Sequence, residues 1–141
     1  MTQRHMEQLS REQCLEYLNA SNVGRIVFVD SDGPCALPIN YGMFADNIVF
    51  RVELKSKLRE ILGAAVAFEV DHMEPDASLG WSVLLRGEAQ EVANDDLPIL
   101  LKAMKGKIPS PWAEGIHNVW ISITSSQMTG RKLGGTHTAA L

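Results

Sequence analysis

The segment NIVFRVELKSKL, residues 47–58, begins as a β-strand and ends in a different structure. Its first half is rich in β-branched and aromatic residues, which favour a strand. Arg51 interrupts this apolar run, and Lys55 and Lys57 follow it. Three cations at one strand-to-helix junction stand out in a chain with a formal net charge of −4. They indicate either a solvated turn or a site for a bound phosphate.

The residues that follow this strand predict a helix of under two turns over 56–63, with Ser56 as N-cap and Gly63 at its end. The first backbone amides of such a helix are unpaired, and the helix dipole places partial positive charge there. Lys57 at the first helical position opposes that dipole unless an anion binds the helix end. Lysines that are simply solvated remain the alternative.

The rest of the chain predicts strands joined by turns, with two further helices. Ser10 and Gln13 form a capping-box pattern before a helix over 11–20, and a second helix is expected over 94–108. The expected strands, besides 47–53, cover 23–30, 35–44, 64–72, 80–92 and 118–133. Pro38 marks an edge or irregular position and Gly87 a bend or bulge. Because the strands do not alternate with helices, we expect a single α+β domain built on a small antiparallel barrel, residues 1–133. Residues 134–141 are expected to be a mobile or partner-docked tail.

Composition narrows the class of protein. The chain has 141 residues, which suits one domain, and no apolar run approaches the ~18 residues that cross a bilayer. The N-terminus is too polar for an export signal, so we expect a cytoplasmic protein. The acidic balance argues against nucleic acid or a membrane as partner. Cys14 and Cys35 have no metal or redox spacing, which indicates reduced structural thiols.

No residue pattern announces a reaction. The four histidines share no ligand spacing, and the acidic loop over residues 71–76 resembles no calcium or zinc motif, so no metal site is assigned. No nucleophile or phosphate-loop motif is present, so no catalytic residue is assigned. Trp120 fits a core position, and Trp112 lies in a loop that covers a pocket or an interface. Trp81 and Ser82 either face a ring-shaped ligand or form a buried edge.

The order of six segments resembles a known family. VGRIVFVD, CALPINY, NIVFRVELKSKL, VAFEVD, GWSVLLRGEAQEV and MTGRKL follow one another as in the pyridoxamine 5′-phosphate oxidase-like proteins with the FMN-binding split barrel. The short, nitroimidazole-resistance-like branch is the most similar, and the resemblance covers residues 8–133. It implies a six-stranded antiparallel split β-barrel and a homodimer with FMN at the subunit interface.

The resemblance also implies which residues bind the cofactor. The FMN ring would lie against two neighbouring strands, largely on backbone groups, and meet a third strand from the side. The phosphate would be bound by a basic strand residue and by the hydroxyl and lysine that follow. Carried over by position, these residues are Pro38, Ile39, Asn40, Phe50, Arg51, Ser56, Lys57, Trp81 and Ser82. Arg131 would reach the site from the other subunit.

The function implied is that of an FMN-dependent oxidoreductase acting on a small planar substrate. The chain lacks the basic, histidine-bearing C-terminal segment of the vitamin-phosphate oxidases, which argues against that substrate. One alternative is a deazaflavin-dependent reductase, with Lys102, Lys105 and Lys107 extending the cationic path for a longer cofactor tail. Another is a non-enzymatic haem- or flavin-binding protein, with His72, His117 or His137 as haem ligand.

Overall fold

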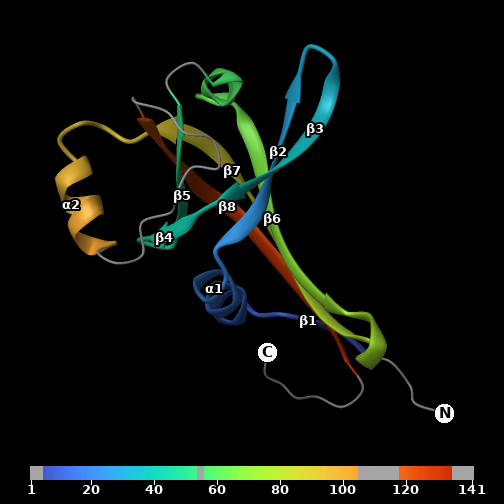
Figure 1. Ribbon diagram of the computed structural model, residues 1–141. Helices are drawn as coiled ribbons and strands as arrows, with labels where there is room; N and C mark the ends of the chain where they lie inside the picture. Colours follow the sequence, from blue (N-terminus) through green and yellow to red (C-terminus); the bar gives the residue numbers. More distant parts are fainter. Residues whose placement is uncertain (1–4, 54–55, 105–117, 135–141) are drawn as a thin grey trace.

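The computed structural model describes residues 5–53, 56–104 and 118–134 (Figure 1). The strands in this part of the chain are β1 His5–Gln8, β2 Val23–Asp30, β3 Gly33–Asn40, β4 Gly42–Phe44, β5 Asn47–Glu53, β6 Ala65–Glu74, β7 Leu79–Glu91 and β8 Asn118–Gly134. The α-helices are α1 Arg11–Ala20 and α2 Leu97–Ala103, and two short 3₁₀ helices are η1 Lys57–Ile61 and η2 Pro75–Ala77.

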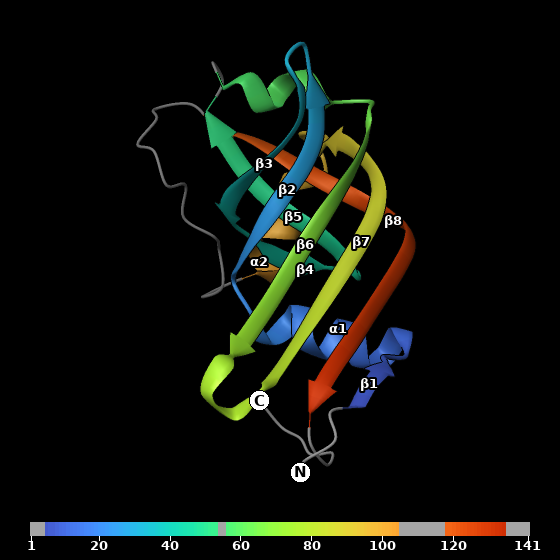
Figure 2. The ribbon, with the colours of Figure 1, turned by 90° about the vertical axis from the view of Figure 1, so that its right-hand side faces the viewer.

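All strand pairs are antiparallel and form one strongly curled sheet. The order is β3-β2-β6-β7-β8-β5-β4, and β1 pairs with the far end of β8. Figure 2 shows β2, β6 and β7 in front of β5 and β4, with α1 at one end of the curl and η1 at the other. The predicted antiparallel split barrel is therefore confirmed. The described residues contain eight strands rather than six, because the short strands β1 and β4 join the sheet.

Most predicted elements occur at the expected positions. Ser10 and Gln13 form the complete capping box of α1, and β2 has the predicted bounds. The register of the β7–β8 pair shifts between Arg86 and Gly87, which confirms the expected bulge. The single strand β8 continues to Gly134, which pairs with His5, so the residue expected to begin the tail belongs to the sheet. The remaining tail, residues 135–141, lies outside the described part.

Two predicted elements are shorter or divided in the structure. The helix of under two turns expected over residues 56–63 is the five-residue 3₁₀ helix η1. The segment 35–44 divides at Tyr41 into β3 and β4, because the chain leaves β2 there and joins β5. Of the helix expected over 94–108, the described residues include α2 Leu97–Ala103.

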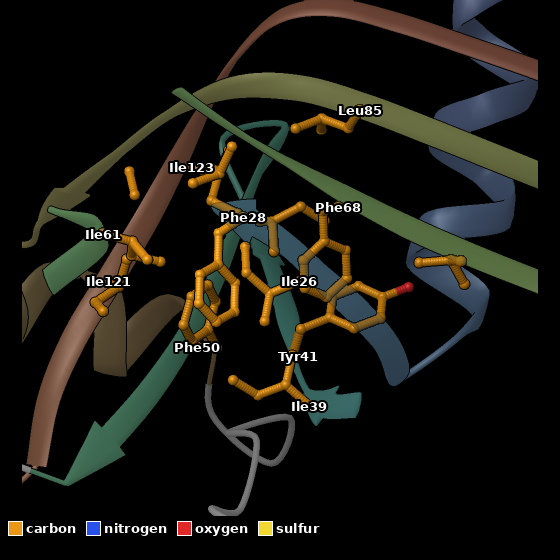
Figure 3. Packing of buried hydrophobic residues seen from close by; sticks show 14 of the residues in the cluster. Ile26, Phe28, Ile39, Tyr41, Phe50, Ile61, Phe68, Leu85, Ile121 and Ile123 are labelled. Atoms are coloured by element: carbon orange, nitrogen blue, oxygen red, sulfur yellow. The ribbon is translucent and has the colours of Figure 1, made fainter. Parts of the chain in front are cut away.

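The main core fills the inside of the curl. Phe68 of β6 lies at its centre and is fully buried. Its ring meets Tyr41 edge-on at a centroid distance of 5.1 Å and stacks near Phe50 at 6.3 Å (Figure 3). Strand alternation explains this arrangement, since every second side chain of β2, β5 and β6 points inward.

A second apolar cluster lies on the outer face of the sheet. Val49 and Trp120 point outward from β5 and β8, and Leu100 and Met104 of the α2 segment cover them. Trp120 is only 7% exposed, which agrees with its predicted core role. The cover by α2 makes β5 a strand that is buried on both faces over residues 48–50.

The Tyr41 hydroxyl ties α1 to the corner between β3 and β4. It donates a hydrogen bond of 2.7 Å to the buried Leu18 carbonyl oxygen. Burial raises the pKa of Tyr41, so the hydroxyl remains a donor at every ordinary pH. Tyr41→Phe should lower the free energy of unfolding by about 1 kcal/mol, because the carbonyl loses its partner. A thermal melt would show a midpoint a few degrees lower, and an unchanged midpoint would contradict this role.

Candidate functional site

The sheet is split where β3 ends. Strand β3 pairs with β2 as far as Val23–Asn40, and β4 pairs with β5 from Gly42–Val49 onward. If the β4–β5 register continued, Asn40 would lie opposite Arg51, but the ladder ends before that pair. The facing edges of β3 and of the second half of β5 are therefore not joined by a strand ladder. The split lies between two segments, residues 38–40 and 50–51, that the resemblance assigns to the cofactor.

The β3 side of the split presents mainly backbone to a ligand. Pro38 is exposed, pairs with Arg25 and has no amide hydrogen to contribute to a ladder. Ile39 is only 9% exposed and belongs to the inner core. Asn40 is half-buried at the last pair of β3 with β2. A flat ligand here would meet backbone groups and the Asn40 amide, as the resemblance implies.

The β5 side of the split provides one half-buried cationic side chain. Phe50 points into the core, so its side chain serves packing rather than a ligand. Arg51 points to the outer face, and its guanidinium carbon lies 5.8 Å from the centroid of the Trp120 ring. Arg51 Nε is buried and has no hydrogen-bond partner among the described residues. A buried donor without an acceptor is costly, so this nitrogen is suited to an acceptor on a ligand.

Ser56 and Lys57 follow at the end of β5. The Ser56 hydroxyl accepts a hydrogen bond of 3.1 Å from the Leu58 amide, which confirms the predicted N-cap. The Ser56 hydroxyl can still donate its own hydrogen to an acceptor on a ligand. Because η1 is a 3₁₀ helix of only five residues, the helix dipole contributes little to an anion site here. The described cationic residues here are Arg51, the exposed Lys57 and the exposed Arg59 of η1.

Trp81 and Ser82 lie far from Lys57 within one subunit. Trp81 is 5% exposed and stacks on Tyr17 of α1, with ring centroids 4.4 Å apart. At the other end of β7, the Ala89 carbonyl accepts a bond of 2.7 Å from Gly63, which follows η1. Trp81 and Ala89 are eight positions apart on β7, about 26 Å along the strand. One bound mononucleotide meets both groups only if a second subunit supplies one of them.

Ser82 lies on the outer face, near a charged cluster that the sequence did not reveal. Arg25 Nη1 lies 3.4 Å from Glu69 Oε1 and also 3.4 Å from Asp71 Oδ2. Burial, followed by the neighbouring Asp71, raises the pKa of Glu69 to about 7, and Arg25 only partly offsets this. Asp71 pairs with Ser82, and Arg25 pairs with Pro38, so the cluster lies between two predicted ligand strands.

The cluster was missed because it depends on strand order. Outward charges at positions 25, 69 and 71 are visible in VGRIVFVD and VAFEVD, but only the β2–β6 pairing brings them together. No group of three or more metal-binding side chains occurs in the described part of the chain. His72, a candidate haem ligand, lies 3.3 Å from Glu74 at the exposed end of β6.

Several other candidates lie outside the described residues. They are Lys55, Lys105, Lys107, Trp112, His117 and His137. Lys102 lies exposed on α2, and Arg131 lies exposed on β8, paired in register with Ser82. No helix in the described ranges is long and apolar enough to cross a membrane.

Fold and split together define a split β-barrel protein. Residues 10–132 match the family described as pyridoxamine 5′-phosphate oxidase. The chain therefore belongs to the pyridoxamine 5′-phosphate oxidase-like split-barrel family, which confirms the resemblance seen in the sequence.

Solved structures with the same fold differ in what they bind. An FAD-binding protein from Mycobacterium smegmatis is 29% identical, with a TM-score of 0.76, covering 89% of this chain and 98% of that one. An FAD- and haem-binding protein from the same organism is 21% identical, with a TM-score of 0.73, covering 94% and 76%. A putative 5-nitroimidazole antibiotic resistance protein from Bacteroides thetaiotaomicron is 14% identical, with a TM-score of 0.69, covering 94% and 91%. Because the last two proteins are only 21% and 14% identical to this chain, they show the shared fold alone.

Proposed function

We propose that the protein is an FMN-dependent oxidoreductase that acts on a small planar substrate. The observation that carries this proposal is the buried Arg51 Nε without a hydrogen-bond partner in the described chain, on the strand that leads to Ser56 and Lys57. Two cations and a hydroxyl form a donor set suited to a phosphate monoester. Pro38, Ile39 and Asn40 supply the neighbouring backbone edge for the ring. Family membership supports the same choice of cofactor class.

In this proposal the flavin carries out the redox chemistry and the protein binds and orients it. This explains why the sequence shows no candidate acid, base or nucleophile. The flavin, when bound, supplies hydride and electron transfer between a reduced donor and an acceptor. Arg51 and Lys57 would hold the phosphate, and Ser56 would orient it. The β3 edge would fix the ring so that one face remains open to a planar substrate.

We further propose a homodimer in which each cofactor lies at the subunit interface. The distance between Trp81 and Lys57 within one subunit supports this, because a second subunit can bring Ser82 or Arg131 to the split. The free thiols of Cys14 and Cys35 support a reducing, cytoplasmic location. A deazaflavin or haem remains a weaker choice, and the described residues offer no added argument for either.

FAD is a second candidate for the cofactor. The FAD-binding protein from Mycobacterium smegmatis is the basis for this alternative, with 29% identity over most of both chains. FAD carries one phosphate more than FMN, and this second phosphate would extend past the first one, which Arg51 and Lys57 would bind. Parallel titrations with FMN and FAD separate the two, since the tighter ligand identifies the cofactor.

The redox function is tested by anaerobic mixing. Flavin-loaded protein should lose its visible flavin absorption when a reduced nicotinamide is added in excess. The absorption should return when a planar quinone or nitroaromatic acceptor is added. Protein that retains flavin but is neither reduced nor reoxidised would be a flavin carrier, which would overturn the enzymatic proposal and leave the cofactor site intact.

A further inference from the structure

Arg51 and Trp120 form a cross-strand pair on the outer face of the sheet. They lie opposite each other in the register of β5 and β8. The guanidinium carbon of Arg51 lies over the Trp120 ring, 5.8 Å from its centroid, which is within the range of about 6 Å for a cation–π contact. The candidate phosphate ligand is thus in direct contact with an aromatic side chain that the resemblance does not assign to the cofactor.

This contact differs from the one that holds Arg25 in the same sheet. Arg25 is shared by the carboxylates of Glu69 and Asp71, which offset its charge and occupy its Nη1 donor. Arg51 forms no ion pair within residues 5–53, 56–104 and 118–134. An aromatic face attracts the guanidinium charge and leaves the N–H donors in the guanidinium plane for other acceptors. Arg51 is therefore held in place while its charge is not neutralised and its Nε donor is unused.

Trp120 is itself held on several sides. Its side chain is 7% exposed and lies in the outer apolar cluster with Val49, Leu100 and Met104, where α2 covers it beside β5 (Figure 1). Its carbonyl oxygen accepts a hydrogen bond of 2.9 Å from the Val92 amide, just past the end of β7. The ring is therefore a fixed surface, and the arginine side chain that lies over it has lost rotamer freedom before any ligand binds.

A cation that is already in place binds an anion more tightly than a freely rotating one. A flexible side chain must be ordered when it binds, and this ordering lowers the affinity. The planar guanidinium then offers donors with a geometry that matches phosphate oxygens. The contact with the ring should therefore strengthen phosphate binding by Arg51.

We propose that Trp120 is a positioning residue for the cofactor phosphate, and that it acts by holding the Arg51 guanidinium over its ring. This inference rests on the proposed function, in which Arg51 binds the FMN phosphate, and adds the residue that places Arg51. The effect of Trp120 on the ligand passes through Arg51. It should therefore depend on the phosphate and not on the flavin ring.

Fluorescence titrations with FMN and with riboflavin, which is the same flavin without the phosphate, test this proposal. Trp120→Leu keeps an apolar side chain in the outer cluster and removes the aromatic face. It should weaken FMN binding about five- to tenfold and leave riboflavin binding within about twofold. Trp120→Phe keeps an aromatic face and should restore most of the FMN affinity. An equal loss of affinity for both flavins would overturn the inference, because Trp120 would then support only the fold.

A double-mutant cycle with Arg51→Met shows whether Trp120 acts through Arg51. In the Arg51→Met background, Trp120→Leu should change FMN affinity by less than about twofold, because the positioned group is gone. A loss in that background as large as in the wild type would overturn the inference. If Trp120→Leu does not fold, Trp120→Met takes its place, since methionine fills irregular apolar space and also lacks the aromatic face.

Phe44→Leu is the matched control for the outer cluster. Phe44 packs against the same cluster, and it pairs with Asn47 at the other end of β5 from Arg51. Its replacement removes an aromatic ring without removing the contact with the guanidinium, so FMN affinity should stay within about twofold of the wild type. A loss equal to that of Trp120→Leu would contradict a specific role for the Trp120 ring.

Thermal melts of the flavin-free protein with inorganic phosphate separate this inference from the proposed function. Unchanged FMN affinity in Trp120→Leu overturns the positioning role and leaves the flavin site standing. A wild type that binds no flavin but is stabilised by phosphate, with the effect lost in Trp120→Leu and Arg51→Met, supports the positioning of Arg51 and overturns the flavin function. A wild type that responds to neither flavin nor phosphate overturns both.

Discussion

Lys57→Ala should weaken FMN binding about tenfold or more. A charge-assisted bond between an ammonium and a phosphate contributes roughly 1.5–3 kcal/mol when its geometry is good, which is about 10- to 150-fold in affinity. Lys57 is exposed at the start of η1, so its loss should change the melting temperature of the flavin-free protein little. Fluorescence titration with FMN gives the affinity, and a thermal melt without flavin gives the stability.

Lys102→Ala is the matched control for this experiment. It removes an exposed lysine side chain from α2, at a position that the resemblance does not assign to FMN, so FMN binding should stay within about twofold of the wild type. Equal FMN affinity in Lys57→Ala and Lys102→Ala would show that the phosphate is bound elsewhere. The assignment of Arg51 as a phosphate ligand would then be rejected together with that of Lys57.

Phe68→Ala should cause the largest loss of stability. The side chain is fully buried between Tyr41 and Phe50, so truncation removes its apolar contacts and leaves a cavity. Such substitutions cost about 3–5 kcal/mol, a large share of the stability of a typical domain. Chemical denaturation should show a correspondingly lower free energy of unfolding, and the thermal midpoint should fall by about 10 °C or more.

Met73→Ala on the same strand is the control for Phe68→Ala. Met73 is 55% exposed, so its truncation should change the free energy of unfolding by about 0.5 kcal/mol or less. If Phe68→Ala does not fold, Phe68→Leu offers a smaller volume change with a measurable loss. Equal stability in the Phe68 and Met73 variants would contradict the central place of Phe68 in the core.

Local sequence signals predicted most of the fold because they act over a few residues. The capping box of Ser10 and Gln13 begins α1, and the alternation of VGRIVFVD gives β2 its buried and exposed faces. Gly87 marks a real bulge, where an added Cβ would collide with the Thr124 backbone. Pro38 marks the edge strand β3, which is the last strand on one side of the sheet. Family resemblance then linked these elements into a split barrel.

Long-range features were not visible in the sequence. The approach of Arg25 to Glu69 depends on the β2–β6 pairing, which joins segments more than forty positions apart. The distance of Trp81 from Lys57 depends on the length and direction of β7. The choice of a 3₁₀ helix at η1 depends on a bond from Arg59 to the Ser56 carbonyl, three residues apart, which the residue pattern did not distinguish from an α-helical turn.

The most direct test of the central claim is a titration of the purified protein with FMN, FAD and the deazaflavin cofactor, followed by visible absorption. The account predicts saturable binding of FMN with a perturbed flavin spectrum, and loss of that binding in Lys57→Ala but not in Lys102→Ala. A protein that leaves the FMN spectrum unchanged at every concentration would contradict the account, because the split between β3 and β5 would then hold no flavin phosphate.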